Sequence, residues 1–111
     1  MATSPFTRQH ARVAPVLTAL ADQTRLTLIT RLCEDGPQSI SRLTVGTDLT
    51  RQAITKHLQV LSDAGLARSE RSGREQLWRV EARRLSEVRR LLSRISSQWD
   101  EALARLREEL E

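Results

Sequence analysis

The stretch Thr50–Gly65, TRQAITKHLQVLSDAG, decides the fold that we predict for this chain. Thr50 can cap a helix N-terminus with its hydroxyl, and Gly65 can leave the helix in the left-handed conformation. One face carries apolar residues at i, i+4 and i+7, which are Ile54, Leu58 and Leu61. The opposite face begins with hydrogen-bond donors and positive charge, at Arg51, Gln52, Thr55 and Lys56. Such a helix can rest on a small core and place its first turn in a DNA major groove.

The length and charge of the chain favour a single domain that contacts a polyanion. The chain has 111 residues, a usual size for one domain, and a net charge of +4. Residues 42–94 contain twelve Lys or Arg and six Asp or Glu, whereas residues 95–111 contain two Arg and five acids. We therefore expect the middle of the chain to contact phosphate groups.

The compartment is predicted from cysteine usage and hydropathy. Cys33 is the single cysteine, so no intrachain disulfide can form and a reducing compartment fits. No apolar run approaches the roughly 20 residues of a membrane span, and the first residues lack the apolar segment of a signal peptide. The sequence predicts a soluble cytoplasmic protein without a membrane partner.

The N-terminal half predicts an arm followed by helices. Residues 1–12 read as a polar arm anchored by Phe6, and the core begins at residue 13. Pro15 leaves two alternatives, a helix that starts near it or a longer, kinked helix. Asp22 should cap a helix that runs to about residue 34. Its inward residues are predicted to be Leu26, Ile29, Leu32 and Cys33. A short helix capped by Ser39 should follow.

After Gly65 the pattern changes to a hairpin. Strands over 66–71 and 74–80 flank Ser72-Gly73, a two-residue turn signal. Leu66, Trp78 and Val80 are expected to point inward. The predicted fold class is mostly α with a small β-hairpin wing, a winged helix-turn-helix whose core spans residues 13–81.

Residues 82–111 predict one long dimerisation helix. A helix of about 28 residues is about 42 Å long, longer than the small core before it. An apolar stripe that outreaches its own domain needs another surface, most simply the same helix of a second copy across a two-fold axis. Trp99 either packs at this seam, which we favour, or lines an effector pocket. The expected dimer interface consists of Val16, Leu20, Leu85, Val88, Leu92, Ile95, Trp99, Leu103 and Leu106.

The third and fourth predicted helices and the wing form a candidate DNA-binding surface. Gln52 suits an adenine edge, and Arg51 suits a guanine edge or a phosphate. Hydroxyls and free backbone N–H groups near Ser39 suit phosphate. Arginines at the wing tip suit the backbone or a narrow minor groove. The complete predicted set is Ser39, Ser41, Thr50, Arg51, Gln52, Thr55, Lys56, Arg71, Gly73 and Arg74.

Two segments resemble the ArsR-type winged-helix repressors. Residues 19–25, ALADQTR, are similar to the family's ALADPTR opening, with Gln23 in place of the usual proline. Residues 50–58, TRQAITKHL, resemble its recognition-helix signature SRQAVSKHL, and LSDAGL at 61–66 continues the likeness. Gly73-Arg74 sits where the family's wing turns. The resemblance covers roughly residues 13–82. It implies a homodimeric bacterial repressor that binds an imperfectly palindromic operator in double-stranded DNA. It also implies that the first and last helices form the dimer interface.

The ligand sets of metal-sensing relatives are missing from this sequence. The family's metalloid site needs clustered cysteines on the short helix, and residues 39–48 contain none. Another family site uses His and acidic residues on the terminal helices, and residues 82–111 contain no His. His57 and Cys33 are expected to pack rather than to bind metal. We therefore expect neither a metal nor another cofactor.

Catalysis has no support in the sequence, which lacks a glycine-rich phosphate loop, a nucleophile elbow and a paired His/Glu motif. Two alternatives to a simple repressor stay open. One is a winged-helix module that binds proteins. The other is the same repressor released by an unknown effector, either a small ligand at the dimer seam or a thiol modification of Cys33.

Overall fold

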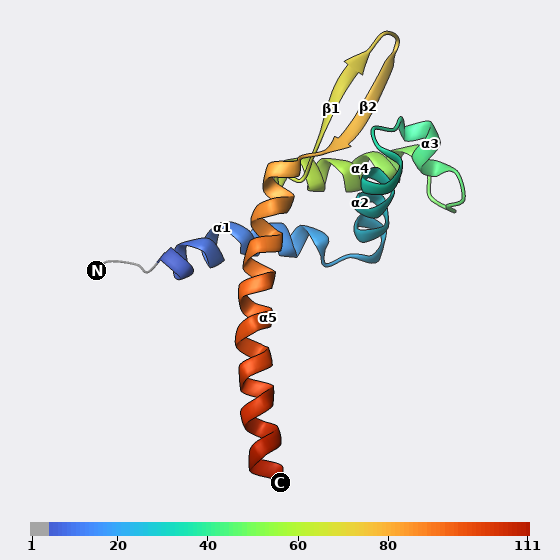
Figure 1. Cartoon of the computed structure of the whole chain (residues 1–111). Helices are drawn as coiled ribbons and strands as arrows, with labels where there is room; N and C mark the ends of the chain where they lie inside the picture. The colour runs from blue at the N-terminus through green and yellow to red at the C-terminus, as the bar shows by residue number, and fades with distance from the viewer. Residues whose placement is uncertain (1–4) are drawn as a thin grey trace.

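The computed structural model describes residues 5–111, and its elements follow the predicted order. Over these described residues, five helices and one antiparallel hairpin form a winged helix-turn-helix (Figure 1). In chain order these elements are α1 (Pro5–Leu20), α2 (Gln23–Asp35), α3 (Ile40–Thr44), α4 (Arg51–Asp63), β1 (Ala67–Ser72), β2 (Glu75–Val80) and α5 (Ala82–Leu110). The prediction of a mostly helical fold with a hairpin wing is confirmed.

Helix α1 corrects the predicted polar arm, because residues 5–12 are already helical. Pro5 occupies the first helical position, where a missing N–H costs nothing. Pro15 lies inside the same helix, at a cost of about 3 kcal/mol for an interior proline. Val13 and Val16 on either side of it are fully buried, and this packing offsets the lost hydrogen bond. The longer helix is therefore the correct alternative. The side chain of Phe6 lies outside the described residues.

Helix α2 is capped as predicted but presents a different face to the core. The Asp22 carboxylate accepts a hydrogen bond from the Arg25 backbone N–H at 3.0 Å. Leu28, Ile29 and Leu32 are buried, whereas Leu26 is 50% exposed and Cys33 is exposed. The prediction that Leu26 and Cys33 point inward is wrong. Apolar residues occur on both sides of this helix, so periodicity alone did not select the buried side.

Helices α3 and α4 begin directly after the predicted caps, Ser39 and Thr50, and α4 ends just before Gly65, as predicted. The Ser39 hydroxyl accepts from the Arg42 N–H at 3.3 Å, and the Thr50 hydroxyl accepts from the Ala53 N–H at 3.0 Å. The apolar face of α4 has no exposed surface and comprises Ile54, Leu58 and Leu61. At its end Gly65 has a φ of 78°, and the bonds Gly65 N–H to Ser62 O and Leu66 N–H to Leu61 O form a Schellman motif.

The wing turns one residue later than predicted. Ser72 pairs with Glu75, so the two loop residues are Gly73 and Arg74 rather than Ser72 and Gly73. Gly73 has a φ of 61°, and glycine at the first central position is typical of a type II′ turn. The predicted turn, Ser72-Gly73, and the observed turn, Gly73-Arg74, both contain this glycine. The observed turn is the one whose strand register buries Trp78.

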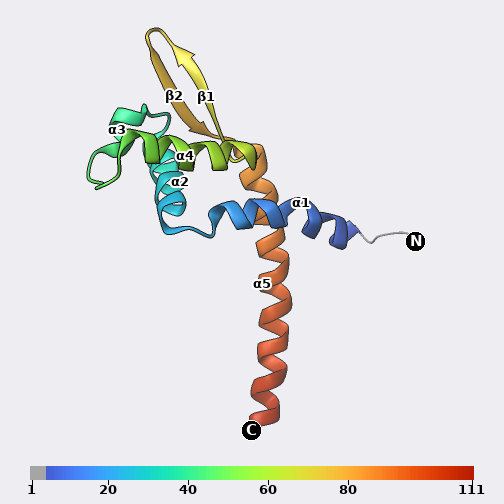
Figure 2. The same cartoon turned by 180° about the vertical axis from the view of Figure 1, so that it is seen from behind.

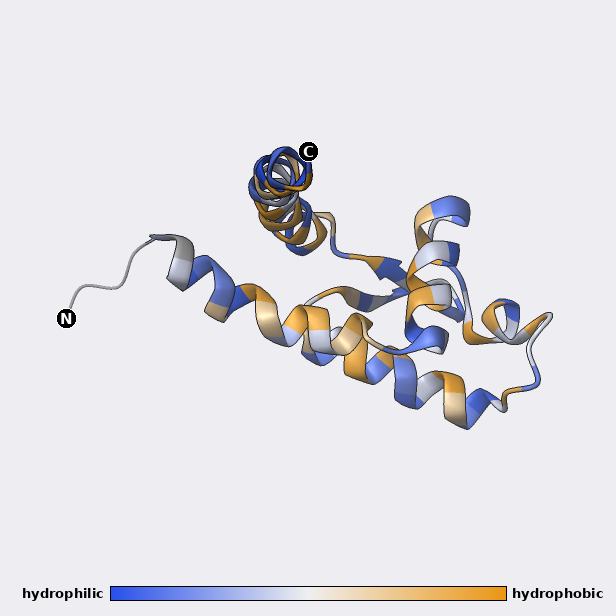
Figure 3. Cartoon of the chain, turned by 90° about the horizontal axis from the view of Figure 1, so that it is seen from below, coloured by the Kyte–Doolittle hydropathy of each residue, from blue (hydrophilic) through white to orange (hydrophobic). Residues whose placement is uncertain are grey.

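Helix α5 crosses α1 and then extends away from the rest of the fold (Figures 1 and 2). At 29 residues it is about 43 Å long. Val88 and Leu91 are its buried residues and pack in the core with Val16. Val16 and Val88, which we expected at a dimer interface, are thus internal to the subunit. Figure 3 looks along α5 from its C-terminal end and shows hydrophobic residues recurring along α1 beside it.

Two arginines fasten α5 to the core. Arg84 donates from Nη2 to the Arg12 carbonyl at 3.2 Å and from Nη1 to the Glu87 carboxylate at 3.1 Å. Arg12 in turn pairs with Glu87 at 3.0 Å. These contacts hold α1 against the first turns of α5. Within residues 5–111, no helix is long and apolar enough to cross a bilayer.

Candidate nucleic-acid interface

The first turn of α4 presents its polar side chains to solvent. Arg51, Gln52, Thr55 and Lys56 are all exposed, while Ile54 behind them is fully buried. The Thr55 hydroxyl donates to the Arg51 carbonyl at 2.7 Å, which leaves its lone pairs free to accept. The fold therefore displays the donors that the sequence assigned to base edges and phosphates.

A cleft of about 350 Å³ joins α3, α4 and the wing. Four residues of the predicted DNA-binding set line it together, namely Ser39, Ser41, Arg51 and Arg74. An Arg51 Nη1–H donates to the Ser41 hydroxyl, so this guanidinium points across the cleft toward α3. Glu75 and Gln76 of β2 also line the cleft, and sequence reasoning did not include them. The arrangement can grip an anionic group between two helices and the wing.

The base of the wing is joined to the segment that leads into α3. Gln38 N–H donates to the Trp78 carbonyl at 3.0 Å, and Trp78 N–H donates to the Gln38 carbonyl at 2.8 Å. Gln38 is 5% exposed. The wing and the helix-turn-helix are thus held as one surface. Sequence reasoning missed Gln38, because no local pattern marks a single isolated bridge.

Arg31 of α2 holds the turn of the helix-turn-helix from behind. Its Nη1 donates to the Leu43 carbonyl at 2.7 Å and its Nη2 to the Arg42 carbonyl at 2.8 Å. A third, longer contact at 3.3 Å reaches the Val45 carbonyl. A five-residue helix leaves most of its carbonyls without partners inside the helix, and this guanidinium donates to two of them. The sequence showed no signal for this role.

A polar cluster links α4 to the start of α2. Arg25 contacts the His57 Nδ1 at 3.4 Å, and the Asp22 carboxylate lies 3.8 Å from the same nitrogen. The hydrogen bond from the Arg25 backbone N–H holds the pKa of Asp22 below its ordinary value. Desolvation opposes this shift, and the positive charges of Arg25 and protonated His57 add to it. In the described part of the chain, no three His, Cys, Asp or Glu residues gather as a metal site.

The wing carries paired and unpaired arginines. Arg79 pairs with Glu70 at 2.7 Å, and Arg68 pairs with Glu81 at 2.9 Å. Arg71 and Arg74, near the tip, are exposed and make no ion pair within residues 5–111. The two arginines predicted to contact DNA are therefore those whose charge is available to a phosphate.

Comparisons with known proteins identify the family. Residues 20–70 match the model of a helix-turn-helix domain. The chain is 40% identical over 65 residues to the uncharacterized HTH-type transcriptional regulator YuzN of Bacillus subtilis, covering 53% of this chain and 71% of that protein. The solved ArsR-like transcriptional regulator from Rhodococcus sp. RHA1 superposes with a TM-score of 0.71 at 38% identity, covering 89% of this chain and 92% of the other. The chain belongs to the ArsR-type winged helix-turn-helix family.

A second solved structure shows the likeness over most of the chain. The winged helix-turn-helix DNA-binding domain of Mb0332 from Mycobacterium bovis, described as homodimeric and as a possible ArsR-family regulator, superposes with a TM-score of 0.64 at 25% identity. The match covers 92% of this chain and 91% of that domain. This ArsR-type protein is thus a transcriptional regulator with a DNA-binding helix-turn-helix domain, and it is not an enzyme.

Proposed function

We propose that this ArsR-type protein is a homodimeric repressor that binds a palindromic operator in the cytoplasm and needs no metal. The observation that carries the proposal is the convergence of Ser41, Arg51 and Arg74 in one cleft beside the exposed first turn of α4. A surface of this kind can contact base edges and flanking phosphates at the same time. Repression follows if the operator overlaps a promoter.

We assign phosphate contacts and base-edge contacts to different residues of the first turns of α4. Arg51 is turned toward Ser41, so we assign it to a phosphate rather than to a guanine edge. Gln52 is exposed on the same turn and is assigned to a base edge, because its amide can bond an adenine in two places. Lys56, one turn later, is assigned to the backbone. Arg71, Arg74 and Gly73 of the wing would follow the DNA on one side.

The dimer is proposed from the exposed stripe of α5. Trp99 is 66% exposed, and Leu92, Leu103 and Leu106 are each about half exposed. Leu92 and Ile95 precede Trp99 by seven and four residues, while Leu103 and Leu106 follow it by four and seven. An antiparallel pair of α5 helices with its two-fold axis beside Trp99 would therefore place Leu92 against Leu106 and Ile95 against Leu103.

Other features agree with this pairing. The same register brings Arg89 and Arg90 of one subunit beside the acidic C-terminal end of the other. Leu20 and Leu85 line an open apolar groove of about 530 Å³ that continues the stripe toward α1. The Mycobacterium bovis domain, which shares this fold, is described as homodimeric. The first and last helices would thus form the interface.

The metal-independent part of the proposal rests on the residues at the family's ligand positions. The short helix has no cysteine, and α5 has no histidine. His57 faces Arg25 and Asp22, and a cation beside it would meet the Arg25 guanidinium. Operator affinity measured with and without a strong chelator should therefore be the same.

The decisive experiment measures binding to the DNA that flanks the protein's own gene. A triple Arg51→Ala, Gln52→Ala, Lys56→Ala variant should lose specific binding. The control, Arg83→Ala with Arg105→Ala, removes the same charge from exposed positions of α5 and should keep specific binding. Equal operator affinity in the triple variant and the wild type would refute the proposal. A monomer without DNA affinity would instead favour a protein-binding module.

A further inference from the structure

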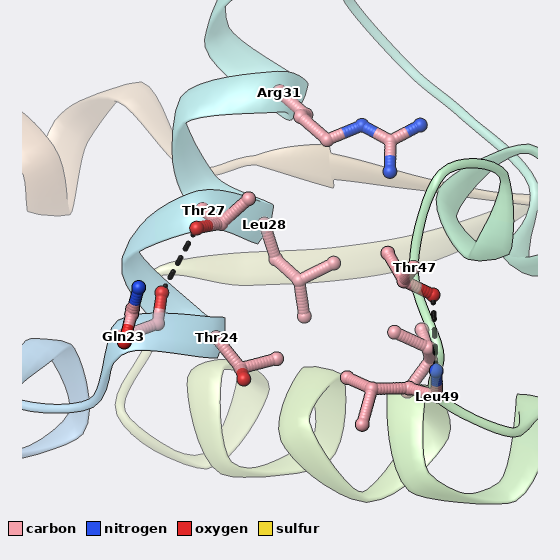
Figure 4. Close-up of a pocket in the computed structure, with 8 residues that line it drawn as sticks. Gln23, Thr24, Thr27, Leu28, Arg31, Thr47 and Leu49 are labelled. Carbon is pink, nitrogen blue, oxygen red and sulfur yellow. Dashed lines mark hydrogen bonds between the residues drawn. The ribbon is translucent and has the colours of Figure 1, made fainter.

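A pocket of about 190 Å³ lies behind the DNA-facing surface (Figure 4). It is bounded by α2, by the turn that precedes α4 and by the first turns of α4. Its lining comprises Gln23, Thr24, Thr27, Leu28, Arg31, Thr47, Leu49 and Ile54. The pocket shares no lining residue with the cleft at Arg51 or with the exposed stripe of α5.

The floor and one wall of this pocket are apolar. Leu28 and Ile54 are almost fully buried, and Leu49 packs partly against the core. Two of the hydroxyls that line it are already engaged, because Thr27 donates to the Gln23 carbonyl at 3.0 Å and Thr47 to the Thr44 carbonyl at 2.8 Å. The pocket therefore suits a mainly apolar ligand, because most of its surface is apolar and two of its hydroxyls already donate to backbone carbonyls.

Arg31 supplies the one charge in the lining. Its guanidinium donates to backbone carbonyls of α3 and the following turn, yet it makes no ion pair within residues 5–111. None of the described residues that line the pocket is acidic. Figure 4 shows Leu28 between the Arg31 guanidinium and Thr24, with Thr47 and Leu49 on the opposite side. A carboxylate near the Arg31 guanidinium would supply the missing counter-charge.

The volume of the pocket limits the size of the ligand that it can hold. An apolar cavity of about 150 Å³ is enough to hold benzene, so the space here suits one ring or a short branched chain with a small polar group. We propose that this pocket binds a small aromatic or branched aliphatic carboxylate.

Such a ligand would act on the DNA-binding surface, a consequence that rests on the proposed function. Thr47 and Leu49 immediately precede the Thr50 cap, and Ile54 belongs to the first turns of α4. A carboxylate that draws Arg31 away from the α3 carbonyls would loosen the turn that positions α4. The ligand therefore lowers operator affinity by altering the angle between α3 and α4.

The binding test uses benzoate and methyl-labelled protein without DNA, so its result is independent of the proposed function. Saturable shifts at the methyl groups of Leu28, Leu49 and Ile54 are expected, with Leu103 and Leu106 of α5 unmoved. Benzyl alcohol, which lacks the charge, and acetate, which lacks the ring, should bind at least about tenfold more weakly. Shifts confined to α5, or no saturable shifts, would overturn the site.

Matched variants on α2 locate the site. Thr27 and Thr30 both donate to the carbonyl four residues earlier, at 3.0 and 2.8 Å, and both are exposed, but Thr30 does not line the pocket. Thr27→Phe should weaken benzoate binding by about tenfold or more, because its ring fills the space, while Thr30→Phe stays near wild type. Equal affinities in the two variants would overturn the site. Unchanged operator affinity in saturating benzoate would overturn the coupling to DNA.

Discussion

Gln38 and Trp78 exchange two backbone hydrogen bonds, of 3.0 and 2.8 Å, and so fasten the wing to the start of α3. The Trp78 side chain is itself 6% exposed and packs in the core. One residue thus supports the wing through both its backbone and its indole ring. The cleft that contains Arg51 and Arg74 depends on this attachment, because those arginines come from the two parts it joins.

The two tryptophans should therefore respond differently to truncation. Trp78→Ala should lower the free energy of unfolding by about 3–5 kcal/mol, the usual cost of removing a buried aromatic ring. Trp99→Ala, at a 66% exposed position, should leave subunit packing intact and weaken only the proposed dimer. Urea unfolding at several protein concentrations separates the two effects. Equal losses that do not vary with concentration would contradict this assignment.

Substitutions at Gln52 and Lys56 should affect DNA binding differently, Gln52 through sequence discrimination and Lys56 through charge. Gln52→Ala should reduce discrimination between operator and mutated operator by about 1–3 kcal/mol, because a bidentate amide contact is lost. Lys56→Ala should weaken binding to all sequences and lower the slope of log affinity against log salt by about one. Fluorescence anisotropy over a salt series measures both quantities. If Lys56→Ala lost discrimination and Gln52→Ala lowered the salt slope, the two assignments would be wrong.

Asp22 should contribute to stability in a pH-dependent way. Its folded-state pKa is lowered, so its contribution is present above the unfolded pKa and is lost as the pH falls through the folded value. Asp22→Asn keeps the helix cap but removes the charge. The urea midpoint of the wild type should exceed that of Asp22→Asn near neutral pH. The difference should shrink as the pH falls below about 3.9, the pKa of an aspartate in an unfolded chain, and should disappear once the pH passes below the lowered folded-state pKa. A difference that persists in acid would contradict the charge argument.

The symmetric stripe of α5 should be sensitive to charge at Leu106 but not at Leu110. Leu106→Glu should dissociate the dimer, because a carboxylate would be buried against Leu92 of the other subunit. Leu110 is 88% exposed, and its symmetric counterpart, Val88, is buried in the subunit core, so Leu110→Glu should keep the dimer. Sedimentation equilibrium of both variants checks this. A dimer that survives Leu106→Glu would rule out the register about Trp99.

The sequence by itself determined the features that depend on neighbours along the chain. Thr50 and Gly65 bound α4 because capping needs only a hydroxyl or a left-handed residue beside the helix end. Asp22 and Ser39 were found for the same reason. The hairpin and the long terminal helix were also clear, because strand alternation and helical periodicity are local patterns.

Only the tertiary structure decided which apolar residues face the core and which distant groups meet. Leu28 rather than Cys33 is buried, because the position of α2 against the core selects the inward side of that helix. The arm became part of α1 because packing beside Pro15 stabilises a helix that local preference disfavours. Contacts from Arg31 to carbonyls of α3 and of the following turn join residues eleven to fourteen positions apart, and the bridge at Gln38 reaches forty positions along the chain. No local pattern encodes such pairs, because they exist only once the core has assembled.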